Sequence, residues 1–180
     1  SRQSLQQCID SVLNQTYASI ELVFMDNAST DGSLEWVKQS YPTIKTINNE
    51  SNLGFARAHN RGIQQTIGDY YMPLNPDVVL SPTFIAEMVK IAIAQDKIGS
   101  VMGKLLFMKS SGEKTDTIYS TGHLLTKSRS PTNRGYKRKD IGQFDKEEFI
   151  FAANGAAPLY SRVMLEDIAM DSDYFCEHFF

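Results

Sequence analysis

Apolar side chains in the first 107 residues fall at the spacings of alternating strands and helices. Between residues 4 and 14 they recur every three or four positions, which predicts a helix with one buried face. Residues 20–25 form a short apolar and β-branched run, which predicts a buried strand. Further strands are expected at 44–48, 69–74 and 98–107, and further helices from 33 to about 40, at 54–67 and at 84–93. This alternation predicts an α/β fold whose mostly parallel central sheet is flanked by helices.

The alternation stops after residue 107. Residues 109–148 are polar and rich in glycine, serine and threonine, so we expect a long irregular insertion there. The insertion contains a cationic stretch, formed by Lys127, Arg129, Arg134, Lys137, Arg138 and Lys139. Its ordinary interpretation is a solvated loop, and the alternatives are contact with a phosphate-bearing acceptor or with an anionic membrane surface. A last helix is expected near 161–168.

Composition narrows the class of protein. A chain of 180 residues with 42% hydrophobic and 22% charged residues fits one soluble globular domain. The net charge of −3 argues against a nucleic-acid partner, which usually requires a strong basic excess. Cys8 and Cys176 lie far apart without metal-ligand spacing, and no apolar run approaches the roughly 20 residues that span a bilayer. We therefore expect a cytoplasmic protein with reduced thiols.

Polar loops follow three of the predicted strands, at residues 26–31, 48–52 and 75–77. Ligands of open α/β sheets bind outside the carboxyl ends of the strands, so we expect these loops to border one cleft. The carboxylate of Asp26 and the amide of Asn27 are suited to pair with the edge of a pyrimidine base. Asp77 could hold a divalent metal ion, with Asn75 as a neutral oxygen donor. Plain capping and turn roles are the alternatives for both segments.

Gly54 and Asn60 each have two possible roles, and the absence of other motifs argues against several classes of enzyme. Gly54 allows close approach of a ligand or ends a turn, and Asn60 faces either a base or solvent. Both glycine-rich phosphate loops are absent, which argues against a Rossmann dehydrogenase and a P-loop enzyme. The spacing of the three histidines is not that of a zinc site; they are His59, His123 and His178.

Several short segments occur in an order that resembles the family 2 glycosyltransferases with the GT-A fold, especially their rhamnosyltransferase-like branch. They are Asn14-Gln15-Thr16-Tyr17, residues 26–33, residues 52–56 with Asn60 and Gly62, residues 74–77, residues 133–135, residues 142–145 and residues 153–157. Order and spacing agree across nearly the whole chain. The resemblance implies an incomplete GT-A-type, Rossmann-like nucleotide-sugar-binding domain. Residues 1–107 would form its nucleotide-binding half, and residues 108–180 its acceptor-side half.

The same resemblance implies roles for individual residues. Asp26 and Asn27 would contact the nucleoside, with Gly54, Asn60 and Asn75 completing the nucleotide site. Residues 75–77 would replace the family's Asp-x-Asp motif, with Asp77 as the carboxylate that holds Mg²⁺ or Mn²⁺. The loop bordering donor sugar and acceptor would consist of Asn154, Gly155 and Ala156.

The implied activity is transfer of a sugar from dTDP-rhamnose or a UDP-sugar to a glycan or lipid-linked acceptor, with inversion. The setting would be cell-surface polysaccharide synthesis, with peripheral contact at the inner face of the membrane. The family's first strand would precede Ser1, and its catalytic base follows a Phe-Phe pair, which here is Phe179-Phe180. We therefore expect a chain truncated at both ends, with the base beyond residue 180. The rival hypothesis is a non-catalytic nucleotide- or glycan-binding module.

Overall fold

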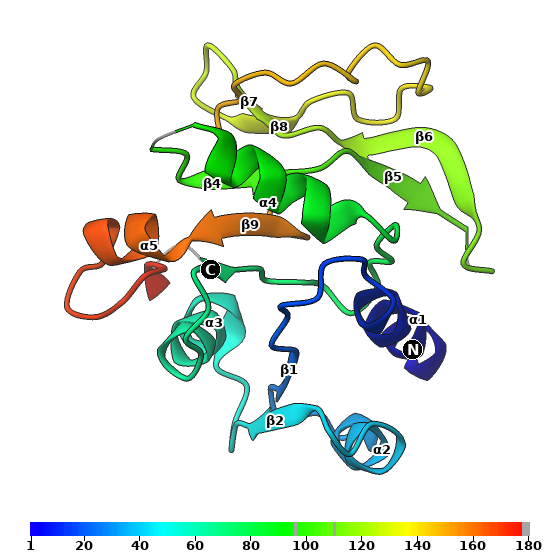
Figure 1. The fold of residues 1–180 in the computed structure, drawn as a ribbon, viewed down its shortest axis with the longest axis vertical. Helices are drawn as coiled ribbons and strands as arrows, with labels where there is room; N and C mark the ends of the chain where they lie inside the picture. The colour runs from blue at the N-terminus through cyan, green and yellow to red at the C-terminus, as the bar shows by residue number, and fades with distance from the viewer. Residues whose placement is uncertain (96, 110, 178–180) are drawn as a thin grey trace. The chain divides into compact units, whose positions relative to one another are not determined.

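The chain folds into two compact units, seen in a computed structural model that describes residues 1–95, 97–109 and 111–177 (Figure 1). One, the 72–160 unit, also contains residues 3–16. The other, the 17–71 unit, also contains the described residues from 161 onward. Each unit thus combines segments that are distant in sequence.

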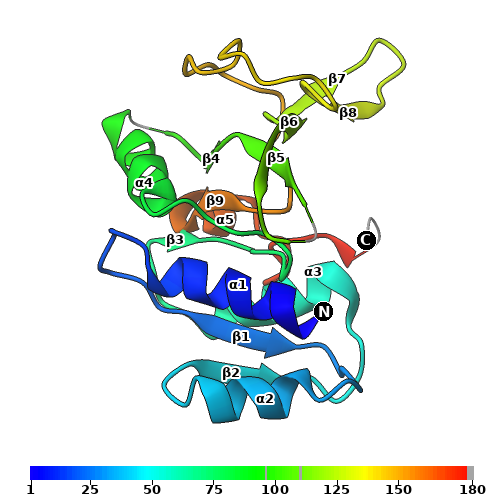
Figure 2. The same cartoon turned by 90° about the vertical axis from the view of Figure 1, so that its right-hand side faces the viewer.

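A parallel strand pair organises the 17–71 unit. Strands β1 (Val23–Asp26) and β2 (Lys45–Asn48) pair in register from Val23 opposite Lys45 to Asp26 opposite Asn48. Helix α2 (Ser33–Ser40) connects them, as Figure 2 shows, and it buries Leu34 and Val37. The remaining elements are α3 (Gly54–Gln64), β3 (Tyr70–Tyr71) and α5 (Arg162–Ile168). The strand–helix–strand crossover predicted from the sequence is confirmed here.

The 72–160 unit pairs its strands differently. Its helices are α1 (Arg2–Leu13) and α4 (Phe84–Ala94). Its strands are β4 (Ser100–Met102), β5 (Leu105–Met108), β6 (Lys114–Ser120), β7 (His123–Leu125), β8 (Pro131–Asn133) and β9 (Pro158–Ser161). The pairs β4–β9, β5–β6 and β7–β8 are all antiparallel. The parallel arrangement expected from the alternation therefore holds for β1 and β2 but not for these pairs.

The helices agree closely with the sequence prediction, but two strand predictions need correction. The run at 98–107 is two strands, β4 and β5, separated at Gly103, where an added Cβ would lie against the ring of Phe84. The segment 109–148 is not wholly irregular, because it contains β6, β7 and β8. In β6 exposed and inward-facing residues alternate, which is the pattern of a strand with one covered face. Among the described helices, none combines the length and apolar character needed to cross a bilayer.

Gly62 shows how tightly α3 packs on its neighbours within the 17–71 unit. A Cβ at this position would lie 2.6 Å from Tyr71 Oη and 2.8 Å from Met25 Cε. We expect Gly62→Ala to lower the free energy of unfolding by about 1–3 kcal/mol through overpacking. In an open helix the same change would instead be stabilising by about 1 kcal/mol. Urea unfolding measures the sign, and a background of Tyr71→Phe should reduce the penalty, because it removes the closest atom. A stabilised Gly62→Ala variant would contradict this packing.

Candidate functional site

Asp26 ends β1 with its carboxylate buried, since only 3% of the residue is exposed. Its Oδ2 accepts a hydrogen bond from the backbone N–H of Ser29 at 3.0 Å, which closes the turn after the strand. Its Oδ1 is also buried, and no donor among the described residues reaches it. An unpaired buried carboxylate oxygen is costly, so such an atom is suited to receive a donor from a ligand. The structure thus places Asp26 as predicted, at the carboxyl end of a parallel strand.

The side chain of Asn27 is bonded to the loop that follows β2. Its Oδ1 accepts from Asn49 Nδ2 at 3.1 Å and from the Leu53 N–H at 3.0 Å. Its Nδ2 donates to Asn52 Oδ1 at 2.8 Å and to the Gly54 carbonyl at 3.4 Å. An amide has two donors and two acceptor lone pairs, so this network uses all four. Asn27 thus holds residues 49–54 in place, and its direct contact with a nucleotide stays a prediction.

Asn49 is a buried site residue that the sequence did not single out. Only 1% of it is exposed, and its Oδ1 accepts from Arg61 Nη1 at 2.6 Å. Its backbone N–H donates to the carbonyl of Asp26 at 2.9 Å. The sequence indicated the amide-rich loop at 48–52 as part of the site, but it does not show which asparagine of this loop is buried.

Gly54 begins α3 with a φ of 72°, in the left-handed region that favours glycine. No atom lies within 4 Å of the position of an added Cβ. The backbone conformation therefore accounts for this glycine, which agrees with the turn interpretation.

Asn60 anchors the C-terminal segment of the 17–71 unit. Its Oδ1 accepts from the N–H groups of Tyr174 at 3.1 Å and Phe175 at 2.8 Å. Its Nδ2 donates to the Phe175 carbonyl at 2.9 Å and to Asp173 Oδ1 at 3.1 Å. The residue is 4% exposed, so it faces neither solvent nor an open surface. These four hydrogen bonds occupy the two donors and both acceptor positions of the Asn60 amide. The expected contact between Asn60 and a nucleotide is not seen among them and stays a prediction.

Neighbouring positions of α3 extend the same contact. One turn before Asn60, Arg57 forms an ion pair with Glu177 at 2.5 Å. One turn after it, Gln64 donates to the Ser172 carbonyl at 3.2 Å. The face of α3 therefore carries residues 172–177. The expected Phe179-Phe180 landmark and His178 lie outside the described residues.

His59 lies among aromatic rings on α3. Its ring centroid is 4.3 Å from that of Phe55, and its Nδ1 is 2.9 Å from Tyr71 Oη. Burial lowers the pKa of His59 to about 4 and raises the pKa of Tyr71 above its ordinary value. The imidazole is therefore neutral at physiological pH and acts as part of the core.

The 72–160 unit brings two of the predicted segments together. The N–H of Asn75 donates to the Ala156 carbonyl at 3.0 Å, and the N–H of Val78 closes the turn on the Asn75 carbonyl at 3.1 Å. Asp77 is exposed in this turn, and its carboxylate makes no hydrogen bond or ion pair with other described residues. The proposed metal turn and the proposed donor–acceptor loop are thus direct neighbours.

Asn154 builds the loop that faces this turn. It is buried, its Oδ1 accepts from the Ala156 N–H at 3.0 Å, and its Nδ2 donates to Asn133 Oδ1 at 3.0 Å. Gly155 between them is exposed. Asn154 therefore shapes the loop, which leaves Gly155 and the backbone as its outer surface.

Chemistry at Asp77 is constrained by its surroundings. Within the described residues no three His, Cys, Asp or Glu side chains cluster closely enough to hold a metal ion. Magnesium in proteins is often held by only one or two carboxylates together with phosphate oxygens of a substrate. Asp77 fits that mode, in which a nucleotide diphosphate completes the coordination.

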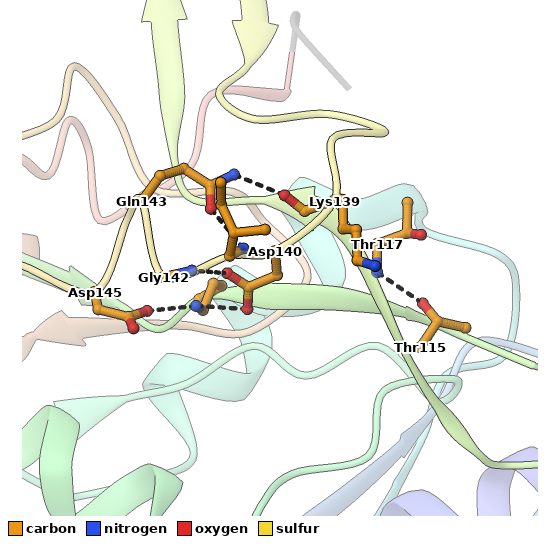
Figure 3. A network of polar contacts seen from close by, with 9 residues as sticks. Thr115, Thr117, Lys139, Asp140, Gly142, Gln143 and Asp145 are labelled. Atoms are coloured by element: carbon orange, nitrogen blue, oxygen red, sulfur yellow. Dashed lines mark hydrogen bonds and ion pairs between the residues drawn. The ribbon is translucent and has the colours of Figure 1, made fainter.

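Part of the cationic stretch is engaged in ion pairs. Arg134 pairs with Glu148, and Lys139 lies 3.3 Å from Asp116. Lys104 bridges Asp140 at 2.6 Å and Asp145 at 2.5 Å. Both aspartates belong to the polar network drawn in Figure 3. Gln143 bonds the Lys139 carbonyl and the Ile141 N–H in the same network, so residues 139–145 form a defined loop.

We expect Asn60→Ala to lower the free energy of unfolding by about 3 kcal/mol, because it strips buried backbone groups of their partners. Amide hydrogen exchange should accelerate at Tyr174 and Phe175, which lose their acceptor. The matched control is Gln64→Ala, which removes one exposed bond and should cost about 0.5 kcal/mol or less. Unchanged exchange at both amides would contradict the anchoring role of Asn60.

The buried His59 predicts a pH dependence of stability. Its folded-state pKa of about 4 lies below its ordinary value of 6.5, so the unfolded chain binds the proton first. Stability is therefore complete above pH 6.5 and falls as the pH drops toward 4, by up to about 1.4 kcal/mol per pH unit. Urea midpoints at pH 7 and pH 5 measure this slope, which should be shallower in His59→Phe. Equal slopes in the two proteins would refute the assignment.

Comparison with known proteins identifies the family of the chain. The family model of "Glycosyl transferase family 2" matches residues 1–168. An uncharacterized glycosyltransferase of Haemophilus influenzae is 31% identical over 109 residues, which are 59% of this chain and 33% of that protein. The uncharacterized glycosyltransferase YibD of Escherichia coli is 28% identical over 125 residues, 65% of this chain and 36% of that protein. The chain thus spans about a third of the length of these curated relatives.

Solved structures share the fold at low sequence identity. The mannosyltransferase PcManGT of Pyrobaculum calidifontis, in complex with GDP-Man and Mn²⁺, aligns with a TM-score of 0.60 at 15% identity, over 94% of this chain and 44% of its own. GalNAc-T7 with UDP, GalNAc and Mn²⁺ aligns with a TM-score of 0.67 at 16% identity, over 94% of this chain and 34% of its own. The α/β fold of the GT-A type is thereby confirmed. The chain belongs to glycosyl transferase family 2.

Proposed function

We propose that the protein transfers a sugar from a nucleotide-diphosphate sugar to a glycan or lipid-linked acceptor, with inversion at the anomeric carbon. Membership of the family supports the transfer itself. As donors we propose dTDP-rhamnose or a UDP-sugar, and as the setting cell-surface polysaccharide synthesis at the cytoplasmic face of the membrane. The rhamnosyltransferase-like branch remains part of this proposal.

The observation that carries the proposal is the buried carboxylate of Asp26. One of its oxygens closes the turn after β1, while the other has no donor among the described residues. The edge of a pyrimidine base offers an N–H in the geometry that a carboxylate oxygen accepts. In our proposal Asp26 therefore pairs with the base, and Asn27 acts by fixing the loop at 49–54 beside it.

We further propose that Asp77 binds a divalent metal ion together with the donor diphosphate. The two solved neighbours carry Mn²⁺ alongside GDP-Man or UDP, which supports a metal in this class of fold. Such an ion would stabilise the negative charge of the departing diphosphate. Because Asp77 belongs to no cluster of three His, Cys, Asp or Glu side chains among the described residues, the ion and the nucleotide should bind together more tightly than either does alone.

The residues of this chain would then position the reactants. Asn154 fixes the loop whose Ala156 carbonyl holds the Asn75 N–H, so the turn carrying Asp77 and the Gly155 surface form one border of the donor sugar. The acceptor hydroxyl would attack the anomeric carbon from the face opposite the nucleotide, in a single displacement that gives inversion.

Calorimetry on this chain with UDP and dTDP, with and without Mn²⁺, tests the proposal. We expect Mn²⁺ to tighten nucleotide binding, Asp77→Asn to abolish only that increment, and Asp26→Asn to weaken binding with or without metal. In the full-length protein, Asp77→Ala should reduce kcat by about 100-fold or more, the scale of losing one electrostatic contact to the transition state.

The matched control is Asp116→Asn, an exposed carboxylate of the same unit as Asp77 that pairs with Lys139. It should leave both the metal increment and turnover unchanged. Nucleotide binding without any turnover by the full-length protein would favour the non-catalytic binding module. An intact metal increment in Asp77→Asn would remove Asp77 from the metal site.

A further inference from the structure

We infer that the end of α1 and the residue just after it position the Asp77 turn, with Cys8, Ser11 and Gln15 as positioning residues. This inference rests on the proposed function, because it assigns a purpose to the placement of Asp77. Cys8 and Ser11 are spaced at i and i+3 on α1, which puts them on one face of the helix, and Gln15 directly follows the C-cap residue Asn14. All belong to the 72–160 unit, as does the segment 75–85 that they contact.

Ser11 fixes the middle of this segment. Its Oγ accepts the N–H of Leu80 at 3.0 Å and donates to the Cys8 carbonyl at 2.7 Å. Leu80 is itself buried, so its N–H depends on this hydroxyl rather than on water. The contact holds the chain three residues after Asp77.

Gln15 fixes the far end of the segment. Its Oε1 accepts the Ile85 N–H at 2.9 Å, and its Nε2 donates to the Ser81 carbonyl at 2.7 Å. Ile85 lies in the first turn of α4, whose N-cap Thr83 makes no side-chain capping bond. From its place just after the end of α1, Gln15 therefore caps α4, a role that short polar side chains usually perform locally. The N–H of Thr16 adds a bond to the Pro82 carbonyl at 2.8 Å.

Cys8 contacts the near end of the segment. Its Sγ–H donates to the Asn75 carbonyl at 3.5 Å, within the turn that presents Asp77. Cys8 is itself buried, so this contact lies in the interior of the unit.

These contacts matter because residues 75–83 form neither helix nor strand. Within the segment itself, backbone bonds join only Val78 to Asn75 and Phe84 to Ser81. Its position therefore depends on α1 and on the Ala156 carbonyl. A metal ion bound by a single protein carboxylate gains most when that carboxylate is held in place beforehand.

The experiment measures Mn²⁺ affinity at saturating UDP, and UDP affinity without metal, in the Ser11→Ala and Gln15→Met variants of this chain. Calorimetry is run well below each Tm, which is recorded separately. We expect Mn²⁺ affinity to fall about tenfold in each variant, the equivalent of about one hydrogen bond, with metal-free UDP affinity unchanged. A purely structural role would lower Tm and leave the metal increment intact.

Controls separate the possible failures. Ser4→Ala makes the same substitution on α1 at a half-buried position whose side chain bonds only Ser1, so it should change neither affinity nor increment. If Gln15→Met does not fold, Gln15→Glu keeps the acceptor for Ile85 while losing the donor to Ser81, and should show part of the loss. An unchanged increment in the Ser11 and Gln15 variants, with its loss in Asp77→Asn, overturns this inference alone. An unchanged increment in Asp77→Asn overturns the proposed function instead.

Discussion

Within each unit, the fold depends on one constraint: the backbone groups of the long polar loops must find hydrogen-bond partners. In this chain side chains supply them. Asn27 and Asn60 each saturate four hydrogen-bonding positions, the first on the loop at 49–54 and the second on the segment at 173–175. In the other unit, Asn154 accepts from the N–H of Ala156, and Ser11 and Gln15 accept from those of Leu80 and Ile85.

The amide and carboxylate side chains of the predicted site differ in how many of their hydrogen-bonding positions the protein itself uses. Among the amides predicted as ligand contacts, Asn27, Asn60 and Asn154 are committed to hydrogen bonds within the protein, whereas the two predicted carboxylates retain capacity. Asp26 keeps one buried oxygen without a donor, and Asp77 keeps its whole carboxylate exposed. Residues that look alike in a motif thus contribute differently, since one kind builds the loops and the other is left to meet a ligand.

The sequence predicts the parts of this fold that depend on local patterns, and misses those that depend on distant partners. Periodic apolar residues located α1, α3 and α4, and the position of Asp26 followed from the end of a buried strand. The break at Gly103 and the strands after residue 109 depend on tertiary contacts, which no local pattern reports. The partners of Asn60 lie more than 110 residues away, so its role as an anchor could not be read from its helix.

The central claim is that Asp26 and Asp77 are the carboxylates that meet the nucleotide and its metal ion. Crystals of the chain grown with UDP and Mn²⁺ test it most directly through anomalous scattering from manganese. The account predicts a manganese peak about 2 Å from an Asp77 carboxylate oxygen, and the uracil N–H within hydrogen-bonding distance of Asp26 Oδ1. A manganese ion bound away from Asp77, or a uracil that leaves Asp26 Oδ1 without a partner, would contradict it.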